Sequence, residues 1–394
     1  MNIKRSGINN QGKILNYKFI KNESQLENIC DNLLKEKIIG VDLEADSMYC
    51  FREKICLIQI ATAGEAFLID PFELKAISPF LKILENPDII KVFHGADFDI
   101  RSIDRDYHTR VNNLFDTEIA CRFLGIKERG LGALLKRYFT VDSNKKYQKA
   151  NWSKRPFKQE MIEYSVMDVA FLVKLYEIIL QQLKDRGRLS WVREECGIQE
   201  KVRYENNNQS PLFKKFKGAG KIGSRSLAVL ENLLQLRMQM AEKKDQPLFK
   251  IMSNSSLMTM AQEKPSTVDQ ILKIRALSPK QAEMYGRFCV EMIIKAMELE
   301  QGQLPLYSKS KRPKKDVKVQ SRIKQLKKMR DKLSSSMGME PGFLLNNAVI
   351  GSIAIIRPDT TETLLKVEDI RQWQVENIGS DIISALGYCN EHGG

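Results

Sequence analysis

Histidine is scarce in this chain of 394 residues, which contains only His94, His108 and His392. Three histidines so far apart argue against a catalytic triad built on histidine. The seven cysteines are scattered and include no close-spaced pair, so neither a zinc site nor a disulfide framework is expected. No Gly-x-x-x-x-Gly-Lys-Ser/Thr phosphate loop is present either, which argues against an enzyme driven by nucleoside triphosphate hydrolysis.

Long apolar runs are also missing. Nowhere do about 18 apolar residues follow one another, and Met1 to Phe19 lacks the apolar core and small-residue cleavage site of a secretory signal. We therefore expect no membrane partner and a cytoplasmic location, where free cysteines stay reduced.

Composition and length indicate a folded protein with a polyanionic partner. Hydrophobic residues make up 43% of the chain and charged residues 28%, which are ordinary values for globular proteins. Its length predicts two or three domains. The formal net charge of +14 favours nucleic acid as the partner.

The first half alternates short β-branched runs with helical patterns and predicts an α/β domain over residues 1–205, a mixed sheet flanked by helices. Strands are expected at 38–43, 55–60, 66–69 and 89–93. Helices are expected at 98–105, 117–124, 131–138 and 158–184.

Strand patterns end near residue 211, and the rest of the chain predicts two small all-α domains at 212–300 and 321–392. Between them, residues 301–320 are polar and rich in lysine, which predicts a linker. The two helical domains are weakly alike, since Lys273-Ile274-Arg275 is loosely echoed by Lys366-Val367-Glu368.

Acidic residues in the α/β domain form the most informative pattern. Asp42 and Glu44 are two apart on an apolar strand, so their side chains point to the same side. Asp99 follows a second strand after the turn His94-Gly95-Ala96. Tyr164 and Asp168 are four apart on a helix and face one way. We expect the four carboxylates and the phenol to converge.

Converging carboxylates repel one another unless cations neutralise them, and a site with oxygen ligands alone selects Mg²⁺ or Mn²⁺ over zinc. Two such ions about 3.5–4 Å apart can clamp the attacking water and the leaving oxygen in phosphodiester hydrolysis. The predicted metal ligands are Asp42, Glu44, Asp99 and Asp168.

Four segments, in this order and spacing, resemble the DEDD 3′-5′ exonucleases in the branch with tyrosine, and within it the ribonuclease D family. They are 41–44, 91–99, 114–117 and 164–168. Segments 227–299 and 322–386 resemble the HRDC domains of that family. The resemblance implies a ribonuclease H-like exonuclease domain followed by two HRDC-like domains. It also implies that Tyr164 orients the attacking water, and that Asp42, Glu44, Asp99, Tyr164 and Asp168 form the catalytic set.

Further residues are candidates for contact with nucleic acid. Trp152 and Arg155 lie in a lysine-rich segment just before the tyrosine helix, where stacking on a base or contact with a phosphate is expected. The run from Lys309 to Lys332 has twelve basic residues against two aspartates, and its Lys314 and Lys315 are predicted phosphate contacts.

Other residues in these motifs have structural interpretations. Asp97 and Asp116 are expected to cap helices or turns, and His94 to serve the turn rather than act as a base. The segment 218–223 matches Gly-x-Gly-x-x-Gly by letter, but it follows no strand, so it predicts a linker.

The resemblance implies a 3′-5′ exoribonuclease that releases nucleoside 5′-monophosphates from RNA 3′ ends, with precursor tRNA and other small structured RNAs as substrates. Two alternatives stay open. One is a DNA 3′-5′ exonuclease, because the same site cleaves either polymer. The other is a catalytically silent RNA-binding scaffold.

Overall fold

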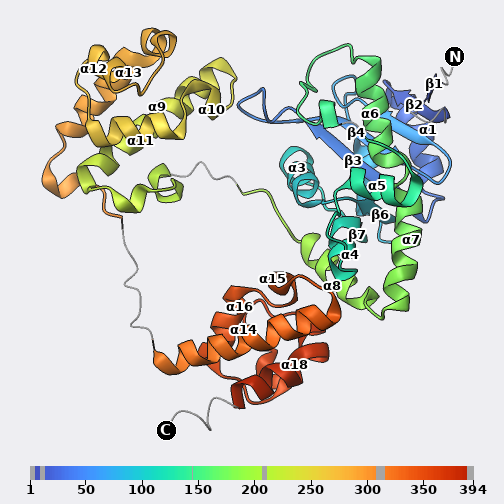
Figure 1. The fold of residues 1–394 in the computed structure, drawn as a ribbon. Helices are drawn as coiled ribbons and strands as arrows, with labels where there is room; N and C mark the ends of the chain where they lie inside the picture. The colour runs from blue at the N-terminus through green and yellow to red at the C-terminus, as the bar shows by residue number, and fades with distance from the viewer. Residues whose placement is uncertain (1–4, 9–13, 144, 206–210, 308–315, 388–394) are drawn as a thin grey trace. The chain divides into compact units, whose positions relative to one another are not determined.

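The computed structural model describes residues 5–8, 14–143, 145–205, 211–307 and 316–387 (Figure 1). The chain divides into two compact units. The first combines Met1–Glu44, Ile55–Tyr204 and Pro313–Gly394, and the second combines Ala45–Lys54 with Glu205–Arg312. None of the described helices is both long and apolar enough to cross a membrane.

A seven-stranded mixed sheet forms the centre of the first unit, in the order β1-β2-β5-β4-β3-β6-β7. β3 pairs in parallel with β6, and β6 in parallel with β7, whereas β4 and β5 are antiparallel. The strands are β1 (Arg5–Ile8), β2 (Ile14–Ile20), β3 (Ile38–Ala45), β4 (Ile55–Ala61), β5 (Ala66–Ile69), β6 (Ile90–Phe93) and β7 (Leu114–Asp116).

Helices cover this sheet. α6 lies against β2, β4 and β5, α7 packs on β6, and α8 packs on β7. The helices of this domain are α1 (Glu23–Leu33), α2 (Ser78–Glu85), α3 (Asp97–Tyr107), α4 (Thr117–Phe123), α5 (Leu131–Phe139), α6 (Gln159–Ala170), α7 (Leu172–Asp185) and α8 (Leu189–Gln199), with the short 3₁₀ helix η1 (Lys145–Tyr147).

The fold class predicted from the sequence is confirmed, with differences in detail. All four predicted strands are present as β3 to β6, since each is a β-branched run buried on both faces. The helix predicted over 158–184 is two helices, α6 and α7, which meet at Phe171. The pattern also missed α1, α2 and α8, as well as β1, β2 and β7.

The second unit is helical in residues 211–307, apart from short irregular connections, and has its own apolar core. The segment 218–223 follows no described strand, but it is not the predicted linker, because it contains the 3₁₀ helix η3 and Ala219 is buried in the apolar core of this unit. The elements are η2 (Leu212–Lys215), η3 (Ala219–Lys221), α9 (Ser224–Lys244), α10 (Leu248–Ile251), α11 (Asn254–Glu263), α12 (Val268–Lys273), α13 (Pro279–Met297) and η4 (Gln301–Gln303).

The C-terminal helices belong to the same compact unit as the sheet. The first of them starts at Val317, inside the stretch predicted as linker, with Asp316 as its N-cap. These helices are α14 (Val317–Met337), α15 (Pro341–Leu344), α16 (Asn347–Ile356), α17 (Thr361–Leu364) and α18 (Gln372–Gly387).

Four aromatic rings join the C-terminal helices to the α/β domain, and we call them the aromatic seam. Trp191 of α8 stacks on Trp373 of α18 at 4.9 Å between centroids and 18° between planes. Phe123 of α4 meets Trp373 edge-on at 5.2 Å and Phe343 of α15 at 4.7 Å. Such pairs add about 0.5–1.5 kcal/mol each beyond the area that they bury.

Polar contacts fix the orientation of this seam. Glu194 accepts hydrogen bonds from the backbone N–H groups of Gln372 and Trp373, which satisfies the first turn of α18. Glu195 accepts from the Trp373 indole at 3.1 Å and from Arg371 at 3.0 Å. The C-terminal helices are thus an integral part of the unit that holds the sheet.

Candidate active site

Three carboxylates meet at the end of the central strands. Asp42 and Glu44 lie on β3, and Asp168 lies on α6. Each can offer one carboxylate oxygen such that the three oxygens lie within 4.8 Å of one another. The period-two geometry of the strand turns Asp42 and Glu44 to the same side, as the sequence indicates.

Asp99 completes what we call the acidic cluster: Asp42, Glu44, Asp99 and Asp168. It lies in the first turn of α3, shortly after β6; the charge of Asp42 raises its pKa, and its own charge raises the pKa of Glu44. The turn that delivers it needs Gly95, whose φ of 76° lies in the left-handed region. Asp116 holds this turn by accepting hydrogen bonds from the N–H groups of Gly95 and Ala96.

Gly40 sets the distance between β3 and the junction of α6 and α7. A Cβ on Gly40 would lie 2.8 Å from Cβ of Leu172 and 3.3 Å from the carbonyl oxygen of Val169. The helix that carries Asp168 can approach the strand this closely only because residue 40 has no side chain. A glycine inside a strand pattern is a sequence signal of such close approach, but Gly40 was not among the residues predicted to matter.

Burial dominates the electrostatics of the cluster. It raises the pKa of Asp42 to about 7 and the pKa values of Glu44, Asp99 and Asp168 well above their usual range. Repulsion between the carboxylates raises the last three further, and no basic side chain contributes to any of the four shifts. A cluster of this kind is stable in its ionised form only beside cations.

Tyr164 lies one turn before Asp168 on α6, close enough for each group to shift the pKa of the other. Burial raises the pKa of the phenol far above its usual range, and the negative charges of Asp168, Glu44 and Asp42 raise it further. The hydroxyl therefore stays protonated, and it can donate one hydrogen bond and accept another.

Trp152 does not have the predicted role. Its indole is 1% exposed and packs between Phe157 and Tyr164, at 5.8 and 6.1 Å between ring centroids. No face is open to a base, so the prediction that Trp152 stacks on nucleic acid is wrong. The ring instead supports Tyr164 from the interior.

Arg155 is also a structural residue. Its guanidinium makes a bidentate ion pair with buried Asp70, at 2.6 and 2.7 Å, and donates to the carbonyl oxygens of Cys56, Trp152 and Lys154. These hydrogen bonds use all five N–H donors of an arginine. The predicted contact between Arg155 and a phosphate is therefore wrong.

Asp116 and His94 have the structural roles expected of them, but Asp97 does not, because the N-cap of α3 is Ala96 and no side chain caps that helix. Asp116 is the N-cap of α4, accepting from the N–H groups of Glu118 and Ile119. Asp97 is largely exposed and pairs with Arg101 one turn later. His94 Nδ1 lies 2.9 Å from the hydroxyl of Thr117, in the turn before α3. Lys314 and Lys315 lie outside the described residues.

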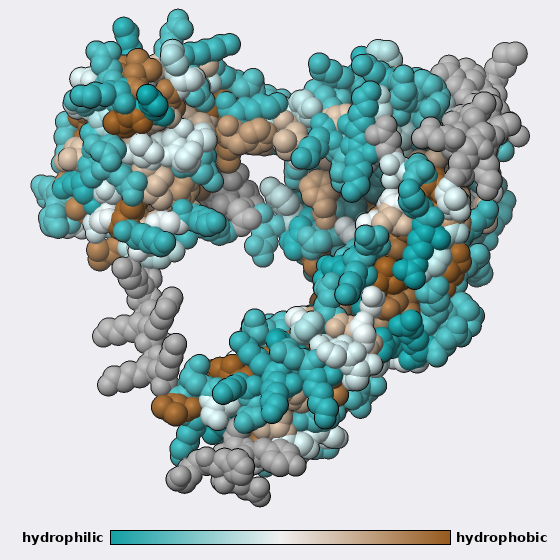
Figure 2. Space-filling model, in the orientation of Figure 1, coloured by the Kyte–Doolittle hydropathy of each residue, from teal (hydrophilic) through white to brown (hydrophobic). Residues whose placement is uncertain are grey.

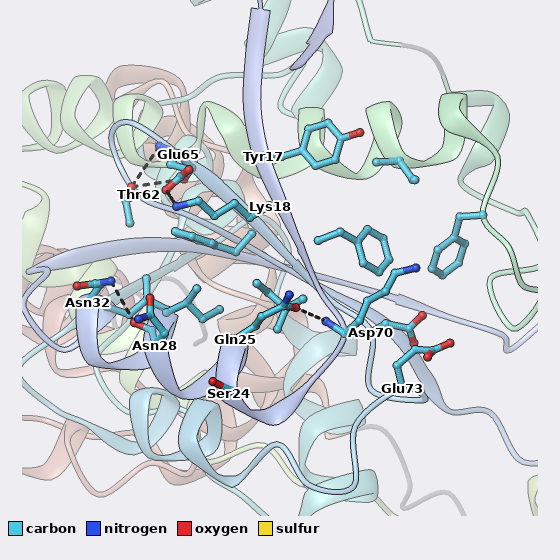
Figure 3. A pocket seen from close by; sticks show the side chains of 18 of the residues that line it. Tyr17, Lys18, Ser24, Gln25, Asn28, Asn32, Thr62, Glu65, Asp70 and Glu73 are labelled. Carbon is cyan, nitrogen blue, oxygen red and sulfur yellow. Dashed lines mark hydrogen bonds and ion pairs between the residues drawn. The ribbon is translucent and has the colours of Figure 1, made fainter. Parts of the chain in front are cut away.

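A cavity of about 870 Å³ lies elsewhere on the α/β domain (Figure 3). Figure 3 shows Ser24, Gln25, Asn28 and Asn32 of α1 on one side of it. One of the cations that line it, Lys18, is paired with Glu65 at 2.8 Å. None of the acidic cluster lines this cavity, so the cavity is separate from the acidic cluster.

Comparison with known families agrees with this architecture. A family of 3′-5′ exonuclease domains matches residues 17–184, and the HRDC domain family matches twice, over residues 226–293 and 319–386. Both helical domains predicted from the sequence are therefore HRDC domains, and their weak similarity to each other is explained.

Individual proteins give the same result. The chain is 32% identical to human exosome complex component 10 over 263 residues, a match that covers 64% of this chain and 30% of the human protein. It is 26% identical to ribonuclease D of Desulfotalea psychrophila, covering 83% of this chain and 88% of that protein. The structure of Escherichia coli ribonuclease D has the same fold, with a TM-score of 0.74 and 21% identity, covering 95% of this chain and 99% of that one. The chain thus matches the 3′-5′ exonuclease domain family over its first half and the HRDC domain family twice over its second half, and it is similar to ribonuclease D along most of its length.

Proposed function

We propose that this protein is a metal-dependent 3′-5′ exoribonuclease that trims the 3′ ends of structured RNAs and releases nucleoside 5′-monophosphates. The observation that carries the proposal is the acidic cluster, in which Asp42, Glu44 and Asp168 bring three oxygens within 4.8 Å beside Tyr164. Four buried or partly buried acids that repel one another are costly to the fold, and an exonuclease domain gives them a use.

The donor set fits divalent cations. Carboxylate oxygens are the ligands that Mg²⁺ and Mn²⁺ prefer, and Asp42, Glu44, Asp99 and Asp168 would hold two of them. Bound there, the ions would neutralise the carboxylates and stabilise charge on the attacking and leaving oxygens of a phosphodiester.

Other residues of the chain would position the attacking water and hold the catalytic groups in place. Tyr164 would use its protonated hydroxyl beside Asp168 to orient the attacking water, since the phenolic oxygen can accept a hydrogen bond from that water. Trp152 packs on the ring and limits its movement. Asp116 holds the turn that delivers Asp99. Hydrolysis would transfer the water oxygen to phosphorus and leave a 3′-hydroxyl on the shortened RNA.

RNA is the proposed substrate, with precursor tRNA and other small structured RNAs as the candidates, and the cytoplasm is the proposed location. The human relative is by name a component of an exosome complex, and the Escherichia coli relative is described as an exoribonuclease involved in structured RNA processing. The basic charge of the chain supports a polyanionic substrate.

End-labelled RNA and DNA of the same sequence, incubated with Mg²⁺ or Mn²⁺ and resolved on a gel, test this proposal. We expect a ladder of products shortened from the 3′ end of RNA, and no cleavage in EDTA. Preferential shortening of DNA would favour the DNA exonuclease. Binding of RNA without shortening would favour the silent scaffold.

The C-terminal HRDC domain supports an RNA-binding part in this function. On α14, Lys324, Lys328 and Lys332 are exposed and spaced by one turn, so they line one side of the helix. Figure 2 shows a mostly hydrophilic surface over this helix. We propose that these lysines contact phosphates of the RNA body, as the rest of the basic run would, with Lys314 and Lys315.

Replacing the three lysines by glutamine tests this contact. Affinity for a hairpin RNA should fall, and the slope of log affinity against log salt should flatten by about 0.7–0.9 for each phosphate that the variant no longer neutralises. The control is Lys295→Gln on α13, whose ammonium is already paired with Glu291 at 2.7 Å. Equal slopes for the triple variant and the wild type would remove α14 from the RNA-binding surface.

A further inference from the structure

Four aromatic rings around Tyr164 form a row in the exonuclease domain, in which Trp152 is buried while Phe157, Tyr164 and Tyr147 are partly buried. The ring centroids of Phe157 and Trp152 are 5.8 Å apart, those of Trp152 and Tyr164 are 6.1 Å apart, and those of Tyr164 and Tyr147 are 6.2 Å apart. Trp152 is 1% exposed, whereas Tyr147 is only partly buried. At one end of the row, Tyr147 is therefore a partly exposed ring beside the proposed catalytic phenol.

Positive charge surrounds this outermost ring. Lys146 places its Nζ over the Tyr147 ring, 5.3 Å from the centroid, and Lys145 and Lys149 are exposed on either side along the chain. The Tyr147 hydroxyl has no hydrogen-bond partner among the described residues. Packing against Tyr164 explains why one edge of the Tyr147 ring is covered. It does not explain why the other, partly exposed edge lies among lysines close to the acidic cluster.

An aromatic ring among cations is what single-stranded nucleic acid needs, because bases stack on the ring while phosphates meet the positive charges. Such a contact was predicted from the sequence for this lysine-rich segment, but at Trp152 and Arg155. Both are used inside the fold. Tyr147 is the aromatic residue of the segment that remains accessible beside Tyr164.

Resting on the proposed function, we propose that Tyr147 stacks on the base of the 3′-terminal nucleotide, while Lys145, Lys146 and Lys149 contact the phosphates of the strand. Tyr164 would orient water toward the phosphodiester on the 5′ side of that nucleotide. A base held on the neighbouring ring keeps this bond in reach of the phenol. The contact would not select sequence, because every base has a flat face.

Two substitutions and one modified RNA test the stacking. Tyr147→Leu removes the ring and Tyr147→Phe keeps it. The modified RNA lacks the base of its 3′-terminal nucleotide. In single-turnover assays with full-length protein and Mg²⁺, Tyr147→Leu should weaken binding of normal RNA by about 5- to 150-fold, with the rate at saturation nearly unchanged. Tyr147→Phe should bind like the wild type.

The abasic RNA makes the test independent of how well the variant folds. Wild-type protein should bind it more weakly than normal RNA by a similar factor, and Tyr147→Leu should scarcely distinguish the two RNAs. The matched control is Tyr138→Leu, which removes another partly buried tyrosine with a cation, Arg137, 5.5 Å from its ring centroid. That control should discriminate as the wild type does.

Failure of the proposed function and failure of the stacking proposal would give different results. If the wild type does not shorten normal RNA, the proposed function fails. If it shortens RNA but binds normal and abasic ends equally, the stacking proposal alone fails. It also fails if Tyr147→Leu lowers the rate at saturation and leaves binding intact, because the ring would then only support Tyr164.

Discussion

The acidic cluster and the aromatic seam are both buried in the same compact unit, yet they are built in opposite ways. The cluster gathers four carboxylates whose burial raises the pKa of each, and repulsion raises the pKa of Glu44, Asp99 and Asp168 further. The seam gathers rings at 4.7–5.8 Å, with the Trp373 indole satisfied by Glu195. In the absence of cations, the acidic cluster destabilises the folded state, whereas the aromatic seam stabilises it.

This difference distinguishes residues that serve the reaction from residues that stabilise the fold. Buried like charges weaken a fold unless something neutralises them, so their presence indicates a function that needs them. Paired aromatic rings need no such explanation. Substitutions in the cluster should therefore remove activity without loss of stability, and substitutions in the seam should do the reverse.

The largest effect should come from Asp168→Asn. Loss of one cluster carboxylate should reduce RNA turnover by about 10⁴-fold or more, because the residues act as a unit. The metal-free variant should melt no lower than the wild type, since a repelling charge is gone. Turnover of end-labelled RNA and melting curves in EDTA check both parts.

The control for that experiment is Asp97→Asn. Asp97 is two residues from Asp99, but it is exposed and pairs only with Arg101 within its helix, an interaction of about 0.3–0.5 kcal/mol. Its turnover should stay near that of the wild type. Normal activity in Asp168→Asn would remove the cluster from the active site.

Tyr164→Phe should have the next largest effect. The variant keeps the ring that packs on Trp152 but lacks the hydroxyl beside Asp168. Turnover should fall by about 10²- to 10⁴-fold, as for other groups that position water or handle protons. Binding of Mn²⁺, followed by calorimetry, should be retained. A loss of metal affinity as large as the loss of rate would make Tyr164 a structural residue.

In the seam, Trp373→Ala should lower stability by about 3–5 kcal/mol, the usual cost of removing a buried tryptophan. Denaturant unfolding measures it, and the rate constant of the protein that remains folded should change little. Trp191→Ala in the same chain should add less than its own effect, because the two rings stack on each other. Strict additivity would show that the stacking contributes nothing.

The seam also changes what the first 205 residues can do alone. All proposed ligands lie there, and the sequence suggested a self-contained domain. Without the C-terminal helices, however, Phe123 and Trp191 would be without the rings that cover them, and Glu194 and Glu195 would be without their partners. We expect the fragment 1–204 to be poorly stable even though its chemical groups are complete.

The contrast between the acidic cluster and the aromatic seam also explains which features could be predicted from the sequence. The acidic pattern was readable because carboxylates inside apolar strands conflict with local chemistry. The seam was not readable, because Phe123, Trp191 and Trp373 look like ordinary core residues and their pairing depends on tertiary packing. For the same reason nothing in the lysine-rich segment showed that Trp152 and Arg155 face inward while Tyr147 faces outward.

Gly40→Ala should combine a loss of stability with a loss of activity. The added Cβ would lie 2.8 Å from Cβ of Leu172, so α6 and α7 must shift, and Asp168 with them. We expect a loss of about 1–3 kcal/mol in unfolding free energy, together with a fall in turnover. Gly197→Ala on α8 is the control, since nothing lies within 4 Å of its added Cβ. If Gly40→Ala loses stability but keeps full turnover, the close approach does not position Asp168.

The smallest effect should be the pH dependence of stability without metal. The folded-state pKa of Asp42 is raised to about 7, while an unfolded aspartate has a pKa of about 3.9. Between these values the folded protein binds more protons than the unfolded chain, so stability should fall as pH rises through this range. Mg²⁺ binds the deprotonated carboxylates, and it should therefore raise the melting temperature more at about pH 8 than at about pH 5.5.

Melting curves in EDTA and in Mg²⁺ at both pH values test this. Asp42→Asn should weaken both trends, whereas Trp373→Ala should lower the melting temperature at each pH and keep them. A shift caused by Mg²⁺ that is equal at both pH values would mean that the cations bind away from the acidic cluster.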